Sequence, residues 1–151
     1  MLISLLPARA DNDYRGHKLG LWLLGLVLVP RIAIGLGSIF NGRNGAAVAD
    51  GIPLDTYSAP AQAQVLNMLA GLGLASFTMG VVGMVVLVRY RSLVPAIFAL
   101  LLLQQSARKL IHYALPIELN AAPGGMINNI LLGLMIAGFA LALWPRRRTT
   151  S

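Results

Sequence analysis

The sequence of 151 residues contains no cysteine, only five acidic residues and only two histidines. Without cysteine, the chain can form no disulfide, no thiolate ligand for a metal ion and no cysteine nucleophile. No aspartate or glutamate lies inside the long apolar segments, whereas a proton-relay pump normally needs a titratable carboxylate at membrane depth. These absences exclude thiol chemistry and argue against a proton pump.

Charged residues are also scarce, at 11% of the sequence, while 57% of the residues are hydrophobic. Such a composition lies far outside the range of soluble globular domains. Four apolar segments are each near or above the roughly 20 residues that span a bilayer as a helix. We therefore predict an all-α integral membrane four-helix bundle that forms one domain over residues 1–151. The predicted spans cover about 19–40, 61–88, 93–115 and 126–144, with an outer loop over about 41–59.

The basic residues gather in three groups at the ends of the predicted spans. By the positive-inside rule these groups share the cytoplasmic side, which places both termini in the cytoplasm. Because membrane topology accounts for the net charge of +7, we expect no nucleic-acid partner. The groups are Arg9, Arg15 and Lys18 before the first span, Arg89 and Arg91 between the second and third, and Arg146, Arg147 and Arg148 after the fourth.

Polar side chains inside the spans gather in the predicted outer half. With a rise of 1.5 Å per residue from the inner basic anchors, Arg31 lies about 20 Å up the first span and Gln104 about 20 Å up the third. A charge within the membrane is costly and ordinarily faces protein or water, so we expect a polar, cationic pocket that opens outward. The candidate ligand-binding residues are Arg31, Asn67, Gln104, Arg108, Lys109, His112 and Asn128.

Arg31 directly follows Pro30, and three roles for it stay open. It can satisfy the carbonyl of Leu26, which Pro30 leaves without its usual partner, or pair with an outer-loop aspartate, or bind a ligand. The small residues Gly35 and Ser38 continue its face of the helix and predict a slim surface above it. For Arg108, Lys109 and His112 the alternative is an interfacial collar that touches lipid phosphates.

Small residues recur every four positions in the second and fourth spans. In a membrane, close approach of backbones must drive helix association, and small residues permit it. We therefore predict helix contacts through Gly71 and Ala75, and through Gly133 and Ala137.

Catalytic signatures are missing: the sequence has no HExxH, GxSxG or Walker-type motif. Ser106, Lys109 and Tyr113 offer a nucleophile, a base and an acid, but their spacing is not specific, so we assign no catalytic residue. His17 and His112 are predicted on opposite sides of the membrane and should not share a metal, although a haem held by His112 alone stays an alternative. We expect no metal and no cofactor.

Three segments carry a resemblance to a known family. The segment PRIAIGLGSIFNG in the first span, the end VLVRYR of the second and SARKL in the third resemble the DoxX-like group of small four-helix bacterial membrane proteins. The resemblance implies a multi-pass protein of the bacterial inner membrane and transfers no activity.

Three functions are compatible with these patterns. The first is a non-enzymatic binding or accessory protein, whose partners are membrane lipids, an anionic or quinone-like ligand, or another membrane protein. The second is a component of a transporter or channel, which would have to oligomerise because the inner halves of the spans carry almost no polar groups. The third is a membrane enzyme acting on lipid or isoprenoid substrates. A homo-oligomer is compatible with all three.

Overall fold

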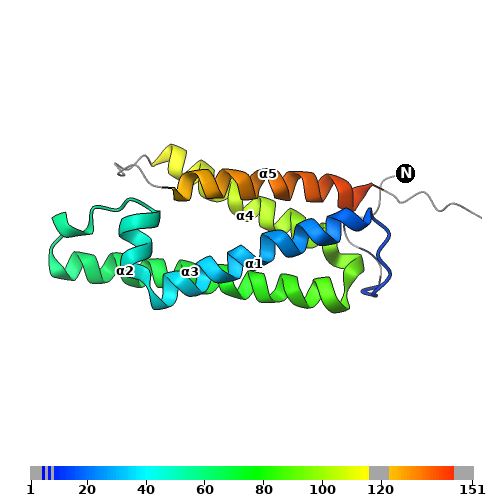
Figure 1. The fold of residues 1–151 in the computed structure, drawn as a ribbon, viewed down its shortest axis with the longest axis horizontal. Coiled ribbons are helices and arrows are strands. Elements are labelled where there is room, and N and C mark those ends of the chain that lie inside the picture. Colours follow the sequence, from blue (N-terminus) through cyan, green and yellow to red (C-terminus); the bar gives the residue numbers. More distant parts are fainter. Residues whose placement is uncertain (1–4, 6, 8, 116–122, 145–151) are drawn as a thin grey trace, which may run out of the picture.

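The computed structural model of the protein describes residues 5, 7, 9–115 and 123–144. Within these residues every regular element is a helix, and four helices are far longer than the others (Figure 1). The elements are α1 (Lys18–Phe40), α2 (Gly42–Asn44), the π-helical turn η1 (Gly45–Ala49), the 3₁₀ turn η2 (Leu54–Thr56), α3 (Ala59–Arg89), the 3₁₀ turn η3 (Arg91–Leu93), α4 (Val94–Ala114) and α5 (Gly124–Leu143).

The four long helices are each apolar and long enough to cross a membrane. They coincide with the four predicted spans to within a few residues at each end. The prediction of an all-α bundle of four long apolar helices is therefore confirmed, and the chain is a multi-pass membrane protein.

Local sequence accounts for where these helices begin. Pro60 and Pro95 occupy the first turns of α3 and α4, where the missing N–H of proline costs no hydrogen bond. At the start of α1, the Nδ1 atom of His17 accepts a hydrogen bond from the backbone N–H of Leu19 at 3.3 Å. That bond caps one of the N–H groups that a helix leaves free at its first turn.

Helix α1 packs most extensively against α3, and it packs against α5 more extensively than α4 does. We describe the bundle as two pairs, α1 with α3 and α4 with α5, joined through the contact of α1 with α5. Although α3 and α4 follow one another in the chain, they contact each other far less than α1 contacts α3. Figure 1 shows the two pairs spreading apart toward the end of the bundle that carries α2 and η1. We call this end the loop end.

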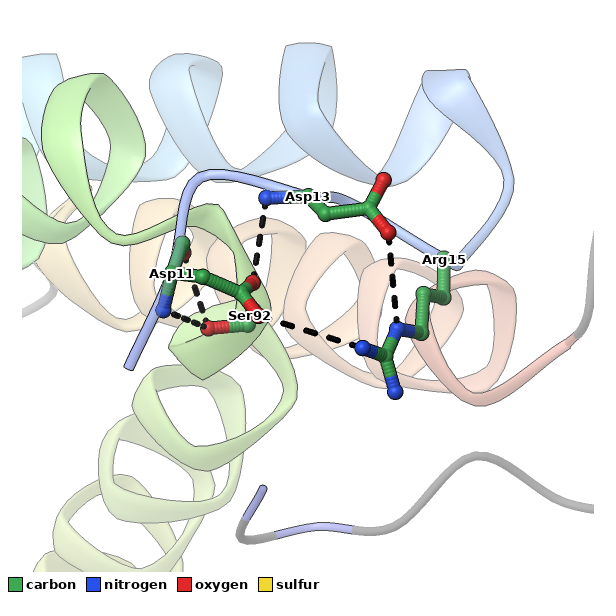
Figure 2. Close-up of polar contacts among 4 residues, drawn as sticks. All are labelled: Asp11, Asp13, Arg15 and Ser92. Carbon is green, nitrogen blue, oxygen red and sulfur yellow. Dashed lines mark hydrogen bonds and ion pairs between the residues drawn. The ribbon is translucent and has the colours of Figure 1, made fainter. Parts of the chain in front are cut away.

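The opposite end is joined by residues 11–17, which we call the strap. The backbone N–H of His17 donates to the carbonyl of Leu141 on α5 at 3.1 Å. Figure 2 shows the Oγ atom of Ser92 beside the backbone of Asp11: it accepts from the N–H of Asp11 at 3.0 Å and donates to the carbonyl at 2.9 Å. The start of α1, the α3–α4 turn and the end of α5 therefore lie together, at what we call the strap end.

Arg15 in the strap lies near two acidic residues, Asp11 and Asp13, at 3.8 and 3.7 Å (Figure 2). All three side chains are largely exposed, so these ion pairs add little to the free energy of unfolding. The two aspartates neutralise part of the positive charge at the strap end.

Glycines set the closest approaches between helices. A Cβ at Gly73 of α3 would lie 2.6 Å from the Cβ of Ser38 and 2.8 Å from the carbonyl oxygen of Gly35, both on α1. The ring of Phe98 on α4 is fully buried and occupies the space that a side chain at Gly138 on α5 would need. Larger residues at these glycines would force the helices apart.

The stripe predicted for helix contacts faces away from the other helices. A Cβ at Gly71 or at Gly133 would meet no atom within 4 Å, and Ala75 and Ala137 are exposed. The prediction recognised the right residue type but chose the wrong side of each helix. The close contacts run instead through Gly73, Gly80, Gly83 and Gly138.

The loop between α1 and α3 is folded onto the bundle. Ala46 in η1 is fully buried and Leu54 in η2 is only 2% exposed. Gly51 adopts a φ of 70°, which favours glycine, and lets the chain turn between these two anchors. The carbonyl oxygen of Ala49 rests where a side chain at Gly124 would lie, so the loop also touches the start of α5.

Candidate functional site

Arg31 is the centre of the polar groups toward the loop end. Only 7% of the residue is exposed, and its Nη2 atom donates a hydrogen bond to Oε1 of Gln104 on α4. Its Nε atom is buried and has no hydrogen-bond partner among the described residues. The amide of Gln104 is neutral, so this contact orients the guanidinium without cancelling its charge.

The structure thus selects a partner for Arg31 that differs from the three considered from the sequence. The slim surface expected above Arg31 is also filled, because Gly35 packs against Gly73 and Phe77 of α3. The hydroxyl of Ser38 donates to the carbonyl of Ile34 on its own helix at 3.0 Å and not toward Arg31. Gly35 and Ser38 therefore serve helix packing, and they do not open space around the arginine.

Two further charges act on this site from the loop end. Arg108 lies one helical turn beyond Gln104 on α4, is exposed, and is close enough to Arg31 to repel it. Asp50 follows η1 and is half-buried; burial raises the pKa of its carboxyl group, while the nearby Arg108 opposes that rise. The group therefore combines two cations, the buried Arg31 and the exposed Arg108, with the half-buried anion Asp50.

Two other polar residues of α4, Gln105 and Lys109, bond to α5. Gln105 is only 4% exposed, and its Nε2 atom donates to the backbone carbonyl of Asn128 at 3.4 Å. Lys109 is exposed and donates from Nζ to Oδ1 of Asn129. These contacts hold α4 to α5, so the predicted residues Lys109 and Asn128 have structural partners.

Two predicted site residues stay apart from the group. Asn67 on α3 and His112 near the end of α4 are exposed, and within the described part of the chain the structure records no hydrogen bond from either side chain to Arg31 or Gln104. Of the seven predicted residues, the structure thus joins Arg31 to Gln104 and places Arg108 beside them. A ligand-binding role for all seven stays a prediction.

Two contributors were not singled out from the sequence as site residues. Gln105 was not among the candidates, although it is only 4% exposed and bonds to the backbone of α5. Asp50 was considered only as an acidic partner, because nothing in the sequence tells how the loop folds back. Ala46 and Leu54 are buried, and they anchor the loop that carries Asp50 against the bundle. Their apolar side chains were the one sign in the sequence that the loop folds back.

At the strap end, the side chain of Tyr14 is tucked against α1 and α5. Its hydroxyl is buried without a partner among the described residues and lies where side chains at Gly16 and Gly20 would be. Burial raises the pKa of Tyr14 to about 12. The neutral tyrosine therefore packs there as an apolar ring.

Hydrogen-bond donors dominate the group around Arg31: the guanidinium groups of Arg31 and Arg108 and the amide nitrogen of Gln104. Donors in this number recognise oxyanions and carbonyl oxygens, and a guanidinium can bind a carboxylate or phosphate through two parallel hydrogen bonds. Across the described residues, no three histidine, aspartate or glutamate side chains lie together in a way that could hold a metal ion. The group is therefore rich in hydrogen-bond donors and positive charge.

Comparisons with protein-family models, with curated proteins and with solved structures find no match to this chain. The resemblance to the DoxX-like group therefore stays a prediction.

Proposed function

We propose that this multi-pass membrane protein is a non-enzymatic binding protein that holds an anionic or carbonyl-bearing ligand at Arg31, Gln104 and Arg108. The observation that carries the proposal is the state of Arg31. Its guanidinium is almost completely buried and is bonded to a neutral amide, and its buried Nε–H has no hydrogen-bond partner among the described residues.

Energetics favour a ligand over a purely structural role. A buried charge is costly unless it is paired and fully hydrogen-bonded, and an apolar residue of similar volume often serves stability as well or better. Here Arg108 repels Arg31, and no ion pair to Arg31 is present among the described residues. An oxyanion between the two guanidinium groups would remove that repulsion and satisfy the free Nε atom.

The strap half of the bundle supports a binding site over a conduction path. Its interior is filled by apolar side chains with no exposed surface: Leu24, Leu28, Phe98, Leu101 and Met135. A path for a polar solute would have to continue through this layer. A transporter or channel role would therefore require the chain to form a path together with other copies or partners.

We further propose that the strap end faces the cytoplasm of a bacterial cell and that the loop end faces outward. The hydrogen bonds of the strap support a common side for the basic residues that flank α1, η3 and α5. A reporter active only outside the cytoplasm, fused after Ser151, should stay inactive. An active reporter would show that the strap end faces outward. That result would contradict the proposed orientation but would leave the position of the site within the bundle unchanged.

The binding proposal is tested by mass spectrometry of small molecules that co-purify with the protein. We expect wild type to retain a ligand and Arg31→Gln to lose it, because the shorter amide removes the charge while keeping a polar group near Gln104. Arg43→Gln is the matched control, since Arg43 is an exposed arginine at the loop end whose Nη2 lies 3.6 Å from Asp55. It should retain the ligand.

Two results would contradict the proposal: wild type that carries no specific ligand, or Arg31→Gln that retains it. Circular dichroism and the thermal midpoint of each variant show whether the bundle is still folded. The identity of the retained molecule also separates the alternatives, because an isoprenoid or lipid found in chemically altered form would indicate an enzyme.

A further inference from the structure

We propose that the end of α3 carries a second site, which binds one anionic phospholipid with an acyl chain in an apolar groove and its phosphate at Arg89. This site lies at the strap end, whereas Arg31 lies toward the loop end. The inference goes beyond the proposed function and does not depend on it.

The groove lies along the last two turns of α3. It is lined by Met84, Val85, Val88 and Arg89 and has a volume of about 330 Å³. Met84 is half-buried and packs against the buried core, while Val85 and Val88 are exposed. Residues four positions apart lie one above the other on a helix, so Val88 follows Met84 and Arg89 follows Val85 along its axis. The groove is therefore apolar along its length and has a cation at the end of the apolar helix.

The guanidinium of Arg89 is available to a ligand. The carbonyl groups at the end of a helix attract a cation, but Arg91 meets this need at α3. Its Nε atom donates to the carbonyl of Leu87 at 3.1 Å. Arg89 is exposed, and within the described part of the chain the structure records neither a hydrogen bond nor an ion pair for its side chain. A free guanidinium can hold a phosphate through two parallel hydrogen bonds.

Charge complementarity selects an anionic lipid as the occupant. Lys18, Arg89 and Arg91 are exposed cations at the strap end, and the two aspartates of the strap lie beside Arg15. Such a cluster attracts anionic headgroups, whereas a zwitterionic lipid brings an ammonium group into the same positive field. Inorganic phosphate would pair with Arg89 but would leave the groove unfilled. The occupant is therefore a molecule with both a phosphate and a hydrocarbon chain.

The experiment compares phosphatidylglycerol with phosphatidylcholine that carries the same acyl chains. The protein is depleted of lipid by extensive detergent exchange, each lipid is titrated back, and native mass spectrometry counts the bound molecules. Arg89→Gln is compared with Lys18→Gln. Both substitutions remove one positive charge from an exposed residue at the strap end, but only Arg89 lines the groove.

We expect wild type to bind one phosphatidylglycerol more tightly than phosphatidylcholine. Arg89→Gln should weaken binding of phosphatidylglycerol about fivefold, the effect of one cation near a membrane surface. Lys18→Gln should weaken it less than about twofold, because solvent screens a charge that does not touch the lipid. Equal affinity of wild type for the two lipids overturns the inference. An equal loss in both variants also overturns it, because that result indicates attraction by overall charge.

Filling the groove tests its apolar part without changing any charge. Val88→Trp places a large ring in the groove, and Val29→Trp is the control on α1, outside the groove. The two valines are similarly exposed, at 63% and 59%, so both variants should fold, which circular dichroism checks. We expect Val88→Trp to weaken binding of phosphatidylglycerol at least as much as Arg89→Gln, and Val29→Trp to leave it unchanged. Equal binding by the two tryptophan variants overturns the groove as the site.

Arg31→Gln separates this inference from the proposed function. It should bind phosphatidylglycerol as wild type does, because Arg31 does not line the groove. If Arg31→Gln loses the lipid and Arg89→Gln keeps it, the lipid binds at Arg31, which supports the proposed function and overturns this inference. If no ligand depends on Arg31 but phosphatidylglycerol depends on Arg89, the proposed function fails and this inference stands.

Discussion

The strap half and the loop half of the bundle are built from the same four helices, yet they solve different physical problems. In the strap half, Gly83 and Gly138 leave room for the side chains of Leu28 and Phe98, which are fully buried there. In the loop half, the helix pairs spread, a folded loop covers part of the end, and a buried arginine is bonded to an amide. The first half is an apolar core, and the second holds the buried charge on which the proposed binding function rests.

The largest loss of stability is expected in the strap half, from a substitution that adds a side chain at Gly138. Because the ring of Phe98 occupies that space, Gly138→Val should lower the free energy of unfolding by about 3 kcal/mol or prevent folding. Gly133→Val is the control on the same helix, where a Cβ meets no neighbour, and should change stability by less than about 0.5 kcal/mol. Unfolding by denaturing detergent, followed by circular dichroism, measures both; equal effects would refute the assigned packing face.

A smaller effect is expected in the loop half from Gln104→Leu. The substitution leaves the buried guanidinium of Arg31 without its hydrogen bond and should cost about 2 kcal/mol of stability. Adding Arg31→Met should restore most of this loss, because an apolar pair of similar volume replaces the unpaired charge. The same unfolding assay measures the stability of wild type, Gln104→Leu and the double variant. A double variant less stable than Gln104→Leu would assign Arg31 a structural role of its own.

The smallest effect concerns pH at the strap end. Folding raises the pKa of Tyr14 from 10.0 to about 12, so the contribution of the neutral ring to stability is complete below pH 10 and is lost as pH rises toward 12. Tyr14→Phe should remove this part of the alkaline destabilisation. Absorbance of ionised tyrosine at high pH should correspondingly lose the component with a midpoint near 12. If the alkaline titration is unchanged by Tyr14→Phe, the ring is not buried as described.

The sequence was sufficient for the helices because a long apolar run has few alternatives in a bilayer, where each backbone polar group needs an internal partner. The matching positions of Arg31 and Gln104 along their helices could also be predicted, since each depends on distance along a single helix. The pairing of Arg31 with Gln104 joined two residues expected at the same depth.

The side of each helix that packs inward could not be predicted. Gly71 and Gly73 are two positions apart, have the same side chain, and face opposite ways: one meets no neighbour, and the other meets the backbone of α1. Only the partner helix distinguishes them. The place of Asp50 could not be predicted for a related reason, because it depends on how the loop after η1 meets the start of α5 and not on any local pattern.

The central claim is that Arg31 contacts a ligand, and the N–H group at its Nε atom reports on it directly. Nuclear magnetic resonance of protein labelled with ¹⁵N in arginine resolves this group, and its signal is assigned by its absence from Arg31→Gln. We expect the Arg31 signal to shift when the co-purified ligand is removed by extensive detergent exchange and to return when the extract is added back. An Arg31 signal identical in both states would contradict the account.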